Sequence, residues 1–281
     1  MKKIQITLTV EEGKEIIALG MLNHPVLINT MKNGKMLFKG GTTVSKITEK
    51  LLGVPLRISG RITSRGTVST KDIIKGPHSI IYYKGQWTNI DETIVGEVLK
   101  FTDKDLIICG ANAFDNNGNA AIMAGSPGGG AVGQSLSSWY TEGAKVIIPV
   151  GIEKIIPGDL NEIIKRTGRN GKSLSWGMSV GLMPLKGELF TEIEAIKILA
   201  NVDCFPIGAG GLGEAHGSST LEILAPTNEE YEKIVKILKE VKSRDIEVGG
   251  IKDSLVECEA ICNNCIRHIG CGYKSKKLQL M

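Results

Sequence analysis

Apolar and polar residues alternate along the opening segment KKIQITLTV, residues 2–10, which predicts an edge strand. Apolar residues then recur at helical spacing at about residues 11–21 and 25–31, and Pro25 suits the first turn of the second helix. The next unit, KMLFKGGTTVSKITEKLLG, contains a strand at about residues 35–39, a glycine turn and an amphipathic helix. The chain therefore opens with strands and helices in alternation.

The same alternation continues through the first 170 residues. Further strands are expected within residues 57–69, 78–85, 105–114 and 145–151, and further helices at about residues 91–101 and 135–142. Alternating strands and helices are typical of an α/β fold. Residues 1–170 are therefore predicted to form a Rossmann-like domain with a largely parallel sheet.

The pattern changes from about Gly171. Strands are expected at residues 177–185, 203–207, 220–224 and 246–250, with two helices between them that open at Thr191 and at Thr227. Each of these threonines is followed three residues later by a glutamate, which is the signature of a capping box. The order strand, helix, strand, strand, helix, strand predicts a ferredoxin-like α+β domain over residues 171–250, followed by a cysteine-rich tail at residues 251–281.

Composition narrows the class of protein. Hydrophobic residues make up 42% of the 281 residues and charged residues 23%, as in ordinary soluble proteins. No apolar run has the length of a membrane span, and the opening MKKIQITLTVEEGK has no apolar signal core, so we expect a cytoplasmic protein with no membrane partner. A net charge of +4 and an aromatic content of 5% argue against nucleic-acid binding. The oligomeric state stays open, with a homo-oligomer among the alternatives.

Four of the six cysteines lie in the C-terminal run CEAICNNCIRHIGC, as Cys258, Cys262, Cys265 and Cys271. Disulfides would need an oxidising compartment, which the start of the chain does not indicate. Structural zinc sites usually pair two C-x2-C knuckles across a longer spacer, whereas the spacers here are three, two and five residues. Close-set thiolates with a more distant fourth suit an iron–sulfur cluster. We therefore predict a [4Fe-4S] cluster at these cysteines, with zinc as the alternative.

A second candidate site is the glycine turn that follows the strand at residues 35–39. Backbone amides at the start of the next helix, two threonine hydroxyls and a lysine cation would form a cradle for phosphate or carboxylate. The residues predicted to bind substrate there are Lys39, Gly40, Gly41, Thr42 and Thr43. The alternative is that glycine serves only a tight turn, with a threonine as the N-cap of the helix.

A third candidate is the segment DLIICGANAFDNNGNAAIMAGSPGGGAVG, residues 105–133. Its strand would bring Asn112 and Asp115, the candidate catalytic residues, to the carboxyl edge of the sheet, where open α/β sheets bind ligands. Asp115 could act as a general base, although Asp-Asn-Asn-Gly is equally a turn signature. Small residues before the next helix leave room for a substrate against bare backbone: Ser126, Gly128, Gly129 and Gly130.

These two units, KMLFKGGTTVSKITEKLLG and DLIICGANAFDNNGNAAIMAGS, together resemble a superfamily that includes ribose-5-phosphate isomerase, glucosamine-6-phosphate deaminase, CoA transferases, sugar-phosphate-sensing repressors and lactate-utilisation proteins. Gly41, Thr42 and Thr43 are similar to its early phosphate-binding turn, and residues 110–118 to its later strand-end element. The resemblance covers residues 11–151 and implies a CoA-transferase-like fold with an anionic substrate. Because some lactate-utilisation proteins are linked to iron–sulfur chemistry, it also favours a cluster at the cysteines. Asn112 stands where a carboxylate is expected in the isomerases, so their reaction is not implied.

Two hypotheses follow from the sequence. In the first, the chain is an iron–sulfur enzyme, of lyase, transferase or oxidoreductase type, that acts on a small phosphorylated, carboxylated or CoA-linked metabolite. In the second, it is a non-enzymatic metabolite sensor or adaptor, in which zinc or an iron–sulfur cluster only staples the C-terminal tail.

Overall fold

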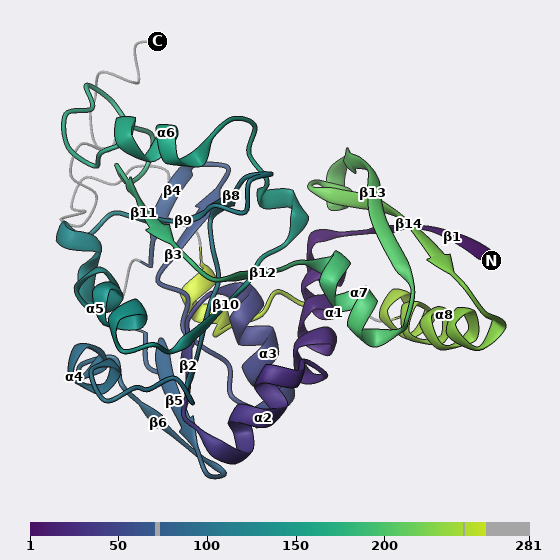
Figure 1. Cartoon of the computed structure of the whole chain (residues 1–281). Helices are drawn as coiled ribbons and strands as arrows, with labels where there is room; N and C mark the ends of the chain where they lie inside the picture. The colour runs from purple at the N-terminus through teal and green to yellow at the C-terminus, as the bar shows by residue number, and fades with distance from the viewer. Residues whose placement is uncertain (71–73, 244, 257–281) are drawn as a thin grey trace.

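The computed structural model describes residues 1–70, 74–243 and 245–256, whose helices and strands form a mixed α/β structure (Figure 1). The largest sheet has six strands in the order β12-β10-β7-β2-β5-β6. In that order the strands are Glu188–Phe190, Lys145–Pro149, Leu106–Cys109, Met36–Lys39, Ser79–Tyr83 and Gln86–Asn89. Neighbours from β12 to β2 are parallel, whereas β5 and β6 are antiparallel to their neighbours, so the sheet is mixed.

The antiparallel end of this sheet is the hairpin β5–β6. Lys84 and Gly85 connect its strands, and their φ angles of 49° and 84° are both positive, as a two-residue type I′ turn requires. A two-residue turn reverses the chain at once, whereas parallel neighbours need a crossover of about a dozen residues or more. The sheet predicted as largely parallel is therefore parallel over four strands and antiparallel at the β6 edge.

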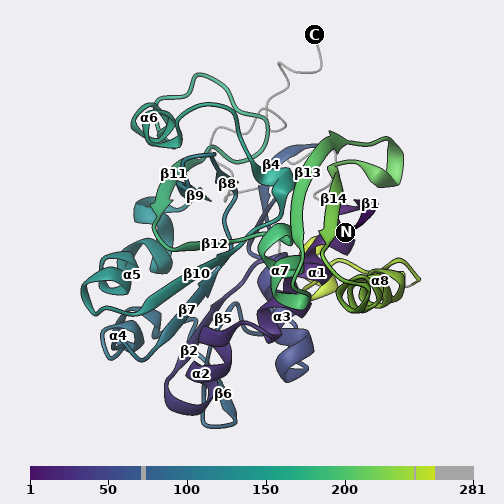
Figure 2. The same cartoon turned by 45° about the vertical axis from the view of Figure 1, so that its right-hand side comes forward.

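Helices cover both faces of the six-stranded sheet (Figure 2). On one face lie α1, α2 and α3, formed by Val10–Leu22, Pro25–Asn33 and Thr42–Leu52. On the other lie α4 and α5, formed by Ile94–Val98 and Gly130–Thr141. Because side chains alternate along a strand, Met36 and Phe38 of β2 pack into the core beneath α1–α3, and Leu37 packs into the core beneath α4 and α5.

A second sheet has three antiparallel strands in the order β1-β14-β13 and lies beside α1 together with α7 and α8 (Figure 1). Its elements are β1 (Lys2–Leu8), β13 (Asp203–Gly210), β14 (Ser218–Ala225), α7 (Glu192–Leu199) and α8 (Asn228–Lys242). The capping box predicted for the first helix is present, since Thr191 and Glu194 cap each other's backbone amides. The hydroxyl of Thr227 accepts the amide of Glu230 at the start of α8.

The partners of the predicted strands in this second unit differ from the expected ones. The opening strand β1 pairs with β14 over seven residues, although its position in the sequence placed it with the first domain. The strand expected at residues 177–185 forms as β11 (Gly181–Leu185), but it pairs with β9 (Ala120–Ala124). With β8 (Ala113–Phe114), these two strands make a separate small sheet. The middle strand β14 therefore pairs with β1 from the start of the chain on one side and with β13, the strand directly before it, on the other.

Residues 246–250, expected to be the last strand of the second unit, form no strand. Gly250 has a φ of 117°, which is outside the range of a β-strand residue with a side chain. A Cβ added to Gly249 would lie 2.5 Å from the carbonyl oxygen of Thr42, so this segment packs with its backbone against the start of α3. The expected strand is replaced by a close backbone contact.

The remaining elements surround the large sheet. They are the hairpin of β3 (Gly60–Thr63) and β4 (Gly66–Ser69), α6 (Leu160–Arg166), and short 3-10 turns at Pro127–Gly129, Ile152–Lys154, Gly213–Ala215 and Lys252–Leu255. In the described part of the chain, no helix combines the length and the apolar character that crossing a membrane would require.

Candidate active site

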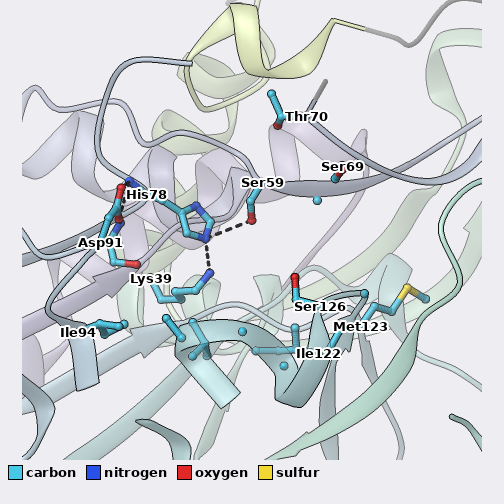
Figure 3. A pocket seen from close by; sticks show the side chains of 18 of the residues that line it. Lys39, Ser59, Ser69, Thr70, His78, Asp91, Ile94, Ile122, Met123 and Ser126 are labelled. Carbon is cyan, nitrogen blue, oxygen red and sulfur yellow. Dashed lines mark hydrogen bonds between the residues drawn. The ribbon is translucent and has the colours of Figure 1, made fainter. Parts of the chain in front are cut away.

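The carboxyl end of β2 opens onto a pocket of about 1200 Å³ (Figure 3). Lys39, the last residue of β2, lines this pocket and lies in register with Cys109 of β7 on one side and Ser79 of β5 on the other. The β3–β4 hairpin, the loop before α5 and parts of residues 169–179 complete the wall. The pocket thus lies at the sheet edge where α/β folds commonly bind ligands.

Lys39 contacts a histidine from the segment before β5. Its Nζ is 2.5 Å from Nε2 of His78 (Figure 3). The other ring nitrogen, Nδ1, is 2.6 Å from the carbonyl oxygen of Arg57, which can only accept a hydrogen bond. Nδ1 therefore carries the ring proton, and Nε2 directs its lone pair towards Lys39. The hydroxyl of Ser59 lies 3.2 Å from the same Nε2.

Asp91 holds His78 in place through the backbone. Its carboxylate accepts hydrogen bonds from the amides of His78 and Ser79, and from Nη2 of Arg57 at 3.0 Å. The carboxylate is therefore bound to the backbone and to Arg57. Lys39 itself forms no ion pair with any residue in the described ranges. The pocket thus contains an amine whose hydrogen-bond partner is an imidazole instead of an acid.

The environment favours the neutral forms of this pair. Burial lowers the pKa of Lys39; Cys109 and Asp91 oppose the shift without cancelling it, and Arg57 adds to it. Because burial raises the pKa of the Cys109 thiol to about 11, that thiol is uncharged at neutral pH and opposes the shift little. Burial and the charge of Lys39 hold the pKa of His78 well below its usual value. Lys39 therefore loses its proton more easily than an exposed lysine, next to a neutral imidazole.

The loop before α5 presents bare backbone to the pocket. Gly128, Gly129 and Gly130 have φ angles of 61°, 77° and 67°, in the left-handed region that side chains disfavour. The twelve-residue helix α5 starts at Gly130 without a side-chain cap, and the residues of its first turn line the pocket. Its first amides are unpaired within the helix, and they favour an anion. The hydroxyl of Ser126 and the amine of Lys39 point into the same space (Figure 3).

The described lining of the pocket combines basic and acidic side chains. Three basic residues line it, Lys39, Arg57 and Arg169, together with two carboxylates, Asp91 and Glu92. Arg57 is paired with Asp91, whereas Arg169 makes a 3.5 Å hydrogen bond to the carbonyl oxygen of residue 125 and no ion pair with a described residue. Arg169 and the start of α5 together provide binding groups for a carboxylate or phosphate.

Of the predicted cradle after β2, only Lys39 lines the pocket. The amide of Gly40 donates to the carbonyl oxygen of His78 at 2.6 Å, and an added Cβ would lie 2.4 Å from that oxygen and from Nδ1. The N-cap of α3 is Gly41, so the interpretation of a threonine as N-cap is wrong. Thr42 is the first residue of α3, and the hydroxyl of Thr43 is buried without a hydrogen-bond partner among the described residues. Residues 40–43 are therefore absent from the pocket lining, although they follow Lys39 directly.

Asp115, predicted as a catalytic base, lies outside the pocket lining. Its carboxylate accepts hydrogen bonds from the amides of Asn117, Asn119 and Leu160, and from the side-chain amide of Asn119. Burial alone would raise the pKa of Asp115, but these hydrogen bonds together lower it. The structure therefore gives Asp115 the turn-forming role that its sequence context also allowed.

Asn112, the other predicted catalytic residue, acts on the pocket through a neighbour. Its amide donates to the carbonyl oxygen of Ala121, and its side-chain oxygen accepts the amide of Met123 at 3.0 Å. Met123 lines the pocket, but Asn112 does not. Asn112 is therefore a positioning residue. The predicted residues that line the pocket are Lys39, Ser126, Gly129 and Gly130, and Gly128 shapes the same loop.

Five site residues were missed in the sequence: Arg57, Ser59, His78, Asp91 and Arg169. No spacing rule connects them with Lys39. The antiparallel pairing of β2 with β5 brings His78 beside Lys39, and Arg57 and Ser59 reach the site through their contacts with His78. A usable signal was composition, since His78 is one of only four histidines and follows a Gly-Pro turn directly before a strand.

The four clustered cysteines lie outside the described residues, so their metal site stays a prediction. The last described residues are tied to the β3–β4 hairpin: Arg61 donates to the carbonyl oxygens of Ser254 and Val256. Thr70, which lines the pocket, donates to the same oxygen of Ser254 at 3.4 Å. Within the part of the chain that the structure describes, no group of three or more His, Cys, Asp or Glu side chains could hold a metal ion.

Comparison of the chain with known protein families, with curated protein sequences and with solved structures gave no match. The superfamily resemblance of the two glycine-containing units therefore stays a prediction. The geometry around Lys39 provides the basis for a functional proposal.

Proposed function

We propose that this protein is an enzyme that binds a small anionic metabolite in the Lys39 pocket and transfers a proton through Lys39 and His78. The observation that carries the proposal is the 2.5 Å contact between the Lys39 amine and a neutral imidazole in an open pocket. A lysine that serves only as a charge commonly pairs with an acid, whereas burial lowers the pKa of the Lys39 amine, so a larger fraction of it is unprotonated and able to accept a proton.

The anionic character of the substrate is supported by the groups that line the pocket. Arg169, the uncapped start of α5 and the hydroxyl of Ser126 are available to a phosphate, a carboxylate or a CoA-linked group. Bound at these groups, the metabolite would present its reacting carbon towards Lys39. The substrate class proposed from sequence is thus retained, with different residues as its main contacts.

Each residue of the pair has a separate role in this proposal. Lys39 takes the proton from the substrate at Nζ, and the proton can pass across 2.5 Å to Nε2 of His78. The hydrogen bond from Nδ1 to the carbonyl oxygen of Arg57 keeps the imidazole in the tautomer that can accept it. Asp91 is a positioning residue, because it binds the backbone of His78 and the side chain of Arg57.

Deuterium exchange tests the proton transfer and does not require the full reaction to be known. Small phosphorylated and carboxylated carbonyl compounds would be incubated with the protein in D2O, and exchange of their C–H protons would be followed by NMR. Lys39→Met and His78→Gln are expected to slow exchange by roughly 10²–10⁴-fold. The exposed residues Lys32 and His216 supply matched controls, Lys32→Met and His216→Gln. Exchange that persists unchanged in Lys39→Met would contradict the proposal.

We also propose that Cys258, Cys262, Cys265 and Cys271 hold a [4Fe-4S] cluster near this pocket, with zinc as the alternative ligand. Their spacing supports the cluster. Its proximity is supported by the binding of Val256 to Arg61, because the two residues from Val256 to Cys258 extend at most about 7 Å.

Anaerobic purification with iron, sulfide and zinc assays and a visible spectrum tests the cluster. Stoichiometric iron and sulfide are expected, and a colourless protein with stoichiometric zinc would contradict it. Cys265→Ser then separates the two roles of the site. Loss of stability with normal chemistry in the pocket would favour a structural staple, as in the sensor or adaptor hypothesis.

At the level of the fold, we propose a Rossmann-like first unit and a ferredoxin-like second unit, as in the superfamily that the sequence resembles. The four parallel strands, the glycine turn after β2 and the glycine loop before α5 support the first. The antiparallel strands β1, β14 and β13 with α7 and α8 support the second. Superposition of an experimental structure on solved members of that superfamily is the test.

A further inference from the structure

We infer that Lys39 forms an imine with the aldehyde or ketone carbon of a metabolite that also carries a carboxylate or phosphate. This inference rests on the proposed function, because it uses the same pocket and the same amine. It narrows the substrate from small anions in general to anionic carbonyl compounds, and it makes Lys39 a nucleophile as well as a proton acceptor.

The first requirement for an imine is a primary amine with a free lone pair at an open surface. Lys39 lines a pocket of about 1200 Å³, and its amine forms no ion pair with a carboxylate of the described residues. Among the described residues, Cys109 of β7, Asp91 and Arg57 act on the pKa of Lys39, and His78 contacts its amine. Of these only Asp91 is a negative charge at neutral pH, and it is paired with Arg57. Desolvated lysines of this kind are the ones that proteins use for Schiff bases.

The second requirement is a group that moves protons during addition and dehydration. Nζ of Lys39 attacks the carbonyl carbon, the C–N bond forms, and the π electrons of the carbonyl go to its oxygen. Nε2 of His78 can take the two protons of Nζ one after the other and pass each to that oxygen: the first gives the carbinolamine, and the second lets the oxygen leave as water when the C=N bond forms. Amine and carbonyl compound thus become imine and water, with no oxidant or reductant.

The third requirement concerns charge. A protonated imine would be a buried cation, which the surroundings of Lys39 disfavour. A negative group on the substrate offsets that charge, and Arg169 with the start of α5 can bind this group. An uncharged aldehyde lacks this compensation. The pocket is therefore expected to select carbonyl compounds that bring their own anion.

Reductive trapping on the full-length protein tests the imine. The probe is glyoxylate, which is an aldehyde with a carboxylate. Sodium cyanoborohydride at neutral pH reduces the imine to carboxymethyl-lysine. Peptide mapping by mass spectrometry then locates the adduct. We expect modification at Lys39 to be faster than at exposed Lys32, because the lowered pKa of Lys39 leaves a larger fraction of its amine unprotonated. Lys39→Arg should lack the adduct, and His78→Gln should form it more slowly than His216→Gln.

A second measurement separates this inference from the proposed function. Glycolate has the carboxylate of glyoxylate but no carbonyl group, and acetic anhydride reports on access to each lysine. If glycolate protects Lys39 from acetylation while glyoxylate leaves it unmodified, the imine is overturned and anion binding stands. If glycolate does not protect Lys39 and glyoxylate modifies all lysines at similar rates, both proposals fail. An adduct confined to Lys39 together with glycolate protection supports both.

Discussion

Gly40 sets the distance between Lys39 and His78, because it has no side chain at the place where the imidazole lies. A Cβ at Gly40 would be 2.4 Å from Nδ1 and from the carbonyl oxygen of His78, whereas a Cβ at Gly41 would have no atom within 4 Å. Two adjacent glycines in one turn therefore have different roles. At the residue scale, the site depends on one missing methyl group as much as on its polar side chains.

Gly40→Ala is expected to push His78 away from Lys39. Overpacking of this kind costs about 1–3 kcal/mol of unfolding free energy, and the rate of glyoxylate adduct formation at Lys39 should fall. Gly41→Ala is the matched control, with a cost of at most about 1 kcal/mol at the N-cap of α3 and an unchanged adduct rate. Urea unfolding and mass spectrometry measure the two effects. Equal losses of unfolding free energy and equal adduct rates in the two variants would contradict this role of Gly40.

Glu192 is a second residue whose behaviour is set by burial, at a distance from the pocket lining. It is the first residue of α7, is 4% exposed, and accepts the amide of Ile152 at 3.0 Å. Burial, followed by the negative charge of Glu153, raises the pKa of Glu192 from 4.5 to about 7, while the Ile152 amide and Lys154 oppose the shift. Because the folded protein disfavours the charged form, Glu192 stabilises the fold only while it stays protonated.

The stability of the protein should therefore depend on pH through Glu192. Its contribution is fully present below the unfolded pKa of 4.5 and is lost as pH rises through the folded pKa of about 7. Glu192→Gln keeps the hydrogen bond to Ile152 and removes the charge, so the variant should exceed the native protein in stability at pH 8 by up to roughly 3 kcal/mol and match it at low pH. Urea unfolding at pH 5 and pH 8 measures this. Glu240→Gln, at an exposed position, is the control. The expectation would be refuted if the free energy of unfolding changed equally with pH in the native protein and in Glu192→Gln.

At the scale of elements, single side chains join segments that lie far apart in the sequence. Asp115 accepts hydrogen bonds within the turn between β8 and β9 and also from the amide of Leu160, the first residue of α6. One buried carboxylate thus fixes the turn and the start of a helix 45 residues later. Its role is to hold elements together, which differs from the catalytic role that its position after a buried strand suggested.

Asp115→Ala should lower the unfolding free energy by roughly 3 kcal/mol, because it leaves the amide of Leu160 buried without a partner. The folded variant should still form the glyoxylate adduct at Lys39 at the native rate. Asp159→Ala, which removes only the exposed N-cap of α6, should cost about 1 kcal/mol. Chemical unfolding and adduct rates distinguish the two. A stable Asp115→Ala protein without pocket chemistry would instead restore Asp115 as a catalytic residue.

At the scale of the whole molecule, one hydrophobic core connects the six-stranded sheet with the β1–β14–β13 sheet. The same cluster of buried side chains contains Leu8 of β1, Ile16 of α1, Phe38 of β2, Ile223 of β14 and Leu238 of α8. Figure 1 shows α1 between the six-stranded sheet and the β1–β14–β13 sheet. The two units are therefore expected to unfold together.

Leu8→Ala tests this shared core at its N-terminal end. Leu8 is 2% exposed, so the cavity should cost about 2–5 kcal/mol, and unfolding should stay a single transition. Gln5→Ala, at an exposed position of the same strand, should change stability by less than about 0.5 kcal/mol. Circular dichroism and tryptophan fluorescence during urea unfolding provide two probes. Separate transitions for the two probes would show independent units.

Much of the local structure was predictable because its causes are local. The helix that starts after Thr191 could be placed from its capping box, and the strand, glycine turn and helix around Lys39 from apolar spacing. Lys39 itself was assigned to the substrate site because it ends a strand before a glycine turn. The strand partners, the hairpin β5–β6 and the replacement of the strand at residues 246–250 were not predictable from these patterns.

The sequence by itself determined where most of the helices and strands form, since caps, turns and side-chain periodicity act over a few residues. It also determined which residues could carry chemistry, and it singled out the cysteine run, which lies outside the described residues. Only the tertiary structure decided that β1 pairs with β14, and that His78 meets Lys39 across 39 residues of sequence. The physical reason is that sheet pairing and burial depend on contacts between distant segments, and it is burial that lowers the pKa of Lys39.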